Sequence, residues 1–180
     1  MSAVLRQYRV TSTARPAEFF CDTSDAPRFD LDQPYQRGVV WGLRRQQNLI
    51  KSLLMGIPVP AIMLNDRFGA EFSHPGYSRD RCWSYAVVDG KQRITALRRF
   101  LNSEFNVPAG WFADGADGEV RFADLTVTQQ RRLRNTPIAV TEGQFATLDA
   151  ERELFDLLNF GGLAQGEADD DNGWAPCERN

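Results

Sequence analysis

The chain has 180 residues, 21 basic against 24 acidic side chains and 42% hydrophobic residues, which is enough for one compact, soluble domain. No apolar run approaches the roughly 20 residues that span a bilayer, and no signal peptide is recognisable, so we expect a cytoplasmic protein with no membrane partner. The three cysteines (Cys21, Cys82, Cys177) and the single His74 lack disulfide or zinc spacing.

The charge is unevenly distributed along the chain. Residues 28–99 hold 12 basic and 6 acidic side chains, whereas residues 142–180 hold 2 and 10. The basic middle favours a polyanionic ligand. Residues 167–180 have the composition of a disordered acidic tail, which either aids solubility or competes with nucleic acid for the basic face. Residues 1–166 contain no repeat or boundary, and we expect them to form a single domain.

The sequence of the first part of the chain predicts a short strand, a loop and one helix. Residues 4–10 fit a short edge strand, and the Ser-, Thr- and Pro-rich residues 11–27 fit a loop. Pro34 disfavours a helix in the segment that follows. Apolar residues at helical spacing then predict an amphipathic helix over 43–55, with Gly56 directly after it.

The middle of the chain predicts two strands and a second helix. Apolar runs at 61–64 and 83–88 fit strands, joined by a polar loop. Since no helix lies between them, we expect an antiparallel hairpin. The second strand leads through the turn Asp89-Gly-Lys-Gln-Arg93 into a helix ending at Leu101.

The last third of the chain predicts further short elements. In order, these are a loop over 102–118, a short strand over 119–122, a short basic helix through Arg134 that Thr126 or Thr128 caps, a strand over 137–140 and a helix ending near Phe160. We expect Thr147 or Asp149 to cap the last helix and its acidic side chains to face outward. Its apolar residues should face inward: Leu154, Phe155, Leu157 and Leu158.

The turn at residues 89–93 carries the strongest functional signal. Gly90 permits positive φ and close approach of a ligand, and the free N–H groups of the following helix form an anion site. Lys91 and Arg93 add cationic donors, and Asp89 could orient water, a metal or a ribose hydroxyl. The turn predicts a phosphate site with one acid at its edge. The alternative is a turn required by geometry alone, with solvated charges.

Three motifs occur in a fixed order. They are Pro34-Tyr-Gln-Arg37 followed by Val40-Trp41, Leu49-Ile-Lys-Ser-Leu-Leu-Met-Gly-Ile-Pro-Val-Pro60, and Val88-Asp-Gly-Lys-Gln-Arg93-Ile-Thr-Ala-Leu97. A weaker fourth motif covers residues 153–162. Together they resemble the N-terminal domain of GmrSD-type modification-dependent restriction enzymes, over about residues 29–167 with the motif core at 29–101. This family is similar to the ParB/sulfiredoxin-like fold group, so the resemblance implies an α/β (α+β) fold with a small mixed sheet flanked by helices.

The resemblance implies a domain that handles nucleotides or DNA. In the family, an Asp-Gly-Gln-Gln-Arg turn is taken as the nucleotide-hydrolysing or DNA-nicking centre. Carried over here, the catalytic residues would be Asp89, Gln92, Arg93 and Arg37. The residues that bind nucleotide or phosphate would be Gly90, Lys91, Arg93, Tyr35, Gln36 and Arg37. Lys91 replaces the family's usual Gln, keeping a donor and adding charge. Since relatives carry a separate His-Asn-His-type nuclease domain and this sequence has one His, we do not expect that nuclease here.

Three functions are open on this basis. The first is an enzyme, either a nucleoside-triphosphate hydrolase or a DNA nickase, with Mg²⁺ or another divalent metal at Asp89; Asp30 and Asp32 are candidates for a second carboxylate. The second is a non-catalytic DNA or nucleotide sensor or regulator in prokaryotic or phage defence or counter-defence. The third is a protein-interaction module that keeps only the fold. A protein partner or a homodimer is compatible with each.

DNA binding would use basic side chains outside the turn. Their contacts with phosphates would make the affinity depend on salt. The candidates are Arg44, Arg45, Lys51, Arg98 and Arg99.

Overall fold

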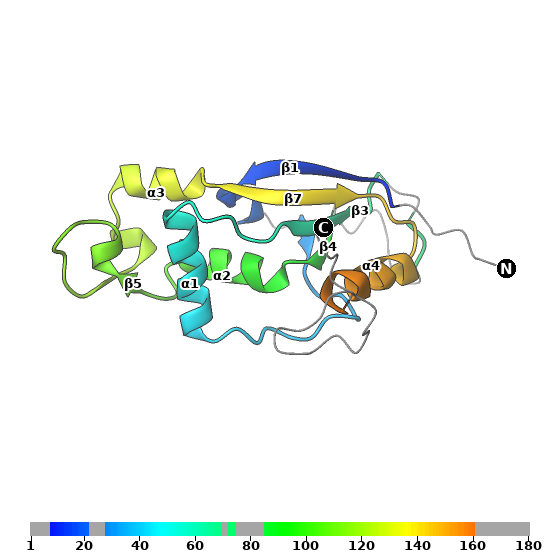
Figure 1. Ribbon diagram of the computed structural model, residues 1–180, viewed down its shortest axis with the longest axis horizontal. Coiled ribbons are helices and arrows are strands. Elements are labelled where there is room, and N and C mark those ends of the chain that lie inside the picture. The colour runs from blue at the N-terminus through cyan, green and yellow to red at the C-terminus, as the bar shows by residue number, and fades with distance from the viewer. Residues whose placement is uncertain (1–7, 22–27, 70–71, 75–84, 161–180) are drawn as a thin grey trace, which may run out of the picture.

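The computed structural model describes residues 8–21, 28–69, 72–74 and 85–160. Within them, a five-stranded mixed sheet has the order β1-β7-β3-β4-β2 (Figure 1). Its strands are β1 (Val10–Pro16), β2 (Phe29–Asp30), β3 (Ile62–Asp66), β4 (Tyr85–Asp89) and β7 (Pro137–Gly143). The pairs β1–β7 and β3–β4 are antiparallel, and β3–β7 and β2–β4 are parallel. The predicted α/β class and the antiparallel pairing of β3 with β4 are confirmed.

Helices and short elements complete the described fold. The α-helices are α1 (Leu43–Leu54), α2 (Lys91–Leu101), α3 (Val127–Arg134) and α4 (Leu148–Phe160). The short elements are the 3-10 helices η1 (Ala17–Phe20), η3 (Ala109–Trp111) and η4 (Phe122–Asp124) and the paired strands β5 (Val107–Pro108) and β6 (Glu119–Val120). Thr126 caps α3 by accepting a hydrogen bond from the Gln129 N–H, as predicted.

The two faces of β4 belong to two hydrophobic clusters, because successive side chains of a strand point in opposite directions. Val87 packs in the main cluster with residues of α1 and α2, including Ile50 and Leu97. Val88 packs on the other face with Leu154 of α4. The end of β4 therefore lies between helices on both sides of the sheet.

The N-terminal strand differs from the prediction. Residues 11–27 were predicted as loop, but β1 occupies Val10–Pro16 and η1 follows directly. Seven residue pairs join β1 to β7, from Val10 opposite Gly143 to Pro16 opposite Pro137. This pairing gives the strand its hydrogen bonds although nearly all of its side chains are exposed. The predicted strand over 4–10 lies mostly outside the described residues.

The inner face of α4 also differs from the prediction. Leu154 is buried, but Leu157 and Leu158 are exposed, because the helix packs on β4 mainly through its first half. One acid predicted to face outward, Glu151, is 0% exposed. The predicted acidic tail over 167–180 lies outside the described residues. No described helix has the length and apolar character needed to cross a membrane.

Candidate functional site

The strand-to-helix turn is built around Gly90. Its φ of +109° lies in the left-handed region, and a Cβ added there would lie 2.9 Å from Cγ1 of Ile62. Both the backbone conformation and the packing against β3 therefore require glycine. Asp89 is the last residue of β4 and Lys91 is the first residue of α2, so both lie at the C-terminal end of the strand.

A cavity of about 190 Å³ lies at this turn. Its lining comes from the turn itself, from the segment after β2 and from the C-terminal half of α4. The lining residues are Gln36, Arg37, Trp41, Asp89, Gly90, Lys91, Gln92, Arg93, Phe155 and Asn159. The structure thus brings Gln36 and Arg37 to the turn, as the sequence predicted. Phe155 and Asn159 were not predicted as site residues, although both belong to the weaker fourth motif.

The cations of the turn are both paired with carboxylates. Nη2 of Arg93 lies 2.6 Å from Oδ2 of Asp89 and also donates to the Ala61 carbonyl at 3.1 Å. Nζ of Lys91 lies 2.8 Å from Oδ1 of Asp32. The Nε of Arg93 is buried without a hydrogen-bond partner among the described residues. Arg37 is exposed at the rim of the cavity.

Gln92 holds the segment that precedes α1. Its Oε1 accepts hydrogen bonds from the N–H groups of Val40 (3.1 Å) and Trp41 (3.2 Å), and its Nε2 donates to the Gly38 carbonyl (3.0 Å). Both ends of the amide are engaged with backbone. The geometry makes Gln92 a positioning residue for the cavity wall, and its catalytic role is still a prediction.

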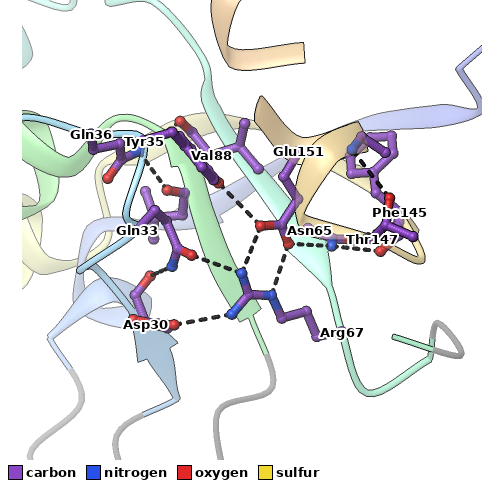
Figure 2. Close-up of polar contacts among 12 residues, drawn as sticks. Asp30, Gln33, Tyr35, Gln36, Asn65, Arg67, Val88, Phe145, Thr147 and Glu151 are labelled. Carbon is purple, nitrogen blue, oxygen red and sulfur yellow. Dashed lines mark hydrogen bonds and ion pairs between the residues drawn. The ribbon is translucent and has the colours of Figure 1, made fainter. Parts of the chain in front are cut away.

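Gln36 extends the sheet beyond the end of β2. That strand pairs only with Tyr85 and Ala86 of β4, and the Gln36 Nε2 donates to the next two carbonyls, those of Val87 and Val88, at 2.7 Å each (Figure 2). The amide thereby replaces a neighbouring strand. Its Oε1 is buried and has no partner among the described residues.

A buried polar network lies behind the cavity wall and was not predicted (Figure 2). Arg67 contacts Glu151 through two nitrogens, at 2.8 and 2.6 Å. Arg67 also donates to Asp30 at 3.0 Å and to Gln33 at 2.7 Å, and the Asn65 Nδ2 donates to Glu151 at 2.6 Å. The network joins the segment after β2 and strand β3 to the first turn of α4.

The electrostatics of this network keep Arg67 charged and Tyr35 neutral at neutral pH. Burial lowers the pKa of Arg67, but Glu151 and Asp30 outweigh it and raise that pKa above the ordinary value. Burial, followed by the Glu151 charge, raises the pKa of Tyr35 far above its ordinary value. Tyr35 therefore stays a neutral donor, with its hydroxyl 3.2 Å from Glu151.

Tyr35 was predicted to bind nucleotide or phosphate beside the turn, but its contacts lie elsewhere. Its hydroxyl binds Glu151, and its ring centroid lies 5.4 Å from that of Phe155. It is not among the residues that line the cavity. Tyr35 therefore contacts the site through Phe155, and direct nucleotide contact by Tyr35 is still a prediction.

The predicted DNA-binding side chains lie in different surroundings. Arg44 and Arg45 are exposed near the start of α1, and Lys51 is exposed with its Nζ 5.9 Å from the Trp111 ring centre. Arg98 donates to the Phe20 carbonyl at 2.7 Å, and Arg99 contacts Glu104 and Gln46, each at 3.0 Å. The two α2 arginines thus use donors within the fold. DNA contact by any of the five is untested.

The carboxylates proposed as partners of Asp89 also have defined positions. Asp30 pairs with Arg67 in the buried network, and Asp32 pairs with Lys91 at the cavity. Among the residues that the structure describes, no group of three or more His, Cys, Asp or Glu side chains could hold a metal ion. Any metal at Asp89 would therefore need ligands from elsewhere. His74 is exposed.

The fold and the cavity define an α/β protein whose strand–glycine–helix turn opens into a charged pocket. A family model described as GmrSD restriction endonuclease, N-terminal domain, matches residues 18–169. The match covers most of the chain, so the chain belongs to this family, and the predicted resemblance is confirmed. Comparison with curated proteins and with solved structures gives no match. The family ties the chain to a function related to restriction endonucleases.

Proposed function

We propose that the cavity at residues 89–93 binds a phosphate group of a nucleotide or of DNA, as part of a function related to restriction. The observation that carries the proposal is that Arg37, Lys91 and Arg93 line one cavity at the N-terminus of α2. Cationic donors and a helix N-terminus favour a phosphate in the same position. The family's name supports DNA as the partner of the domain.

Hydrolysis of a nucleoside triphosphate or nicking of DNA is the activity that we propose for this site. Lys91, Arg93 and Arg37 would stabilise charge that develops on the phosphate. Mg²⁺ is compatible with the cavity, because it is usually held by one or two carboxylates together with phosphate oxygens and water. Asp89, a partly exposed carboxylate of the lining, fits that mode of binding.

A specific observation favours a non-catalytic sensor as the second candidate. The Asp89 carboxylate is engaged by Arg93, and both ends of the Gln92 amide are engaged by residues 38–41. In this arrangement, neither residue is free to activate water. A sensor would bind the same phosphate and release no product.

The test is binding and phosphate release with nucleoside triphosphates and with DNA, in the presence of Mg²⁺. Arg37→Ala and Lys91→Ala are each expected to weaken binding by about ten- to a hundredfold, the usual effect of one charge-assisted hydrogen bond. Arg131→Ala is the matched control, because this arginine is exposed on α3 and does not line the cavity.

The outcomes separate the candidates. Release of phosphate or nicked DNA by the wild type, lost in Arg93→Ala, supports the enzyme. Binding without product supports the sensor. If Arg131→Ala weakens binding as much as Lys91→Ala does, the cavity is not the binding site.

A further inference from the structure

The two ion pairs of the cavity differ in their contact with solvent. The Lys91 side chain is only 12% exposed, but its partner Asp32 is 91% exposed, so water and salt screen the attraction between them. The side chains of Asp89 and Arg93 are only 31% and 13% exposed. Because salt and water screen partly buried charges less than exposed ones, the ion pair between Asp89 and Arg93 is stronger than the pair between Asp32 and Lys91.

Arg93 is the cavity residue best suited to grip a phosphate, because a guanidinium offers a planar fork of donors. Its Nη2, however, is already shared between Asp89 and the Ala61 carbonyl. A phosphate that binds the guanidinium through Nη2 would therefore compete with the Asp89 carboxylate for this donor. In a cavity of about 190 Å³ the two anions would also repel each other.

We propose that Asp89 is an internal competitor at the phosphate site, and that it releases Arg93 only when a divalent cation arrives with the phosphate. This inference rests on the proposed phosphate site. Asp89 then exchanges one cationic partner for another, and Arg93 becomes free for the phosphate. Phosphate and cation bind tightly together and weakly when separate.

Binding of β,γ-methylene analogues of nucleoside triphosphates tests this, because the analogues cannot lose the γ-phosphate. Isothermal titration calorimetry is run with excess EDTA and with MgCl₂. Wild type is expected to bind at least about tenfold more weakly in EDTA. Asp89→Asn, which keeps the side-chain shape and removes the charge, is expected to bind in EDTA at least about tenfold more tightly than wild type and to lose most of its response to Mg²⁺.

A control variant distinguishes competition from a general loss of negative charge. Glu104→Gln removes a carboxylate from an Arg99 pair outside the cavity, and it is expected to change EDTA binding by less than about threefold. Asp89→Ser, with folding checked by circular dichroism, replaces Asp89→Asn if the latter does not fold.

The inference is overturned if uncharged residues at position 89 bind the analogue in EDTA no more tightly than wild type. Equal tightening in Glu104→Gln overturns it as well, since the effect would then be one of net charge. The inference is likewise overturned if wild type binds the analogue equally tightly in EDTA and in MgCl₂. If no variant binds under either condition, the phosphate site itself fails, and this inference fails with it.

Discussion

Gly90 is the residue on which the geometry of the turn depends most directly. Its left-handed φ of +109° and its approach to Ile62 place two separate demands on the same position. Gly56 also has a positive φ, of +69°, but nothing lies within 4 Å of where its Cβ would be. The two glycines therefore separate the cost of the conformation from the cost of the contact.

We predict that Gly90→Ala lowers the free energy of unfolding by about 2–5 kcal/mol, because it adds steric strain against Ile62 to the left-handed penalty. Gly56→Ala should cost only about 1–2 kcal/mol, the conformational part. Urea unfolding of both variants measures the difference. Equal losses would show that contact with Ile62 does not constrain the turn.

Gln92 gives a second prediction at this scale. Gln92→Ala should free the N–H groups of Val40 and Trp41, which its Oε1 now binds. Hydrogen exchange at these two amides should rise by about five- to tenfold, the effect of losing a hydrogen bond of about 1 kcal/mol. Gln92→Glu keeps the acceptor and serves as the matched control. Unchanged exchange in Gln92→Ala would rule out the positioning role.

Among the elements, α4 is attached to the sheet through the carboxylate of Glu151, whose burial the sequence of the helix does not predict. Glu151 is fully buried between Arg67, Asn65 and Tyr35. The same helix carries Phe155 and Asn159 into the cavity. The buried network therefore helps to position one cavity wall. Disrupting the network should lower the stability of the fold and also shift that wall.

We predict that Glu151→Ala lowers the free energy of unfolding by about 3–5 kcal/mol, because Arg67 is left buried with too little compensating charge. Glu153→Ala, at an exposed position of the same helix, should cost no more than about 0.5 kcal/mol. The double variant Arg67→Met/Glu151→Leu removes both charges and should recover most of the loss. Thermal and urea unfolding provide the measurement, and a double variant less stable than Glu151→Ala would contradict this account.

Across the whole molecule, elements determined by local sequence could be predicted and those that depend on distant partners could not. The helical spacing of Leu49, Ile50 and Leu53 and the glycine at the β4–α2 turn act over a few residues, and both predictions are confirmed. By contrast, β1 depends on a partner strand more than a hundred residues away. Burial of Glu151 depends likewise on Arg67, which lies in the turn after β3.

The candidate site follows the same division. The turn residues and the Gln36–Arg37 segment could be named from motifs because each motif is contiguous. The pairing of Arg93 with Asp89 is also local, four residues apart on the chain, but which partner a cation chooses depends on the cavity around it. Phe155 and Asn159 reach the cavity because the buried network and apolar packing against Val88 together set the position of α4.

The place of β7 in the sheet has a consequence for how the chain folds. This strand lies between β1 and β3 and is hydrogen-bonded to both. A ribosome must complete residue 143 before Val10 can pair, since its partner is Gly143. Until then, one edge of β3 in the nascent chain is exposed and β1 has no β7 to pair with. Such long-range closure slows folding, and in that interval the unpaired edges are open to aggregation or to chaperones.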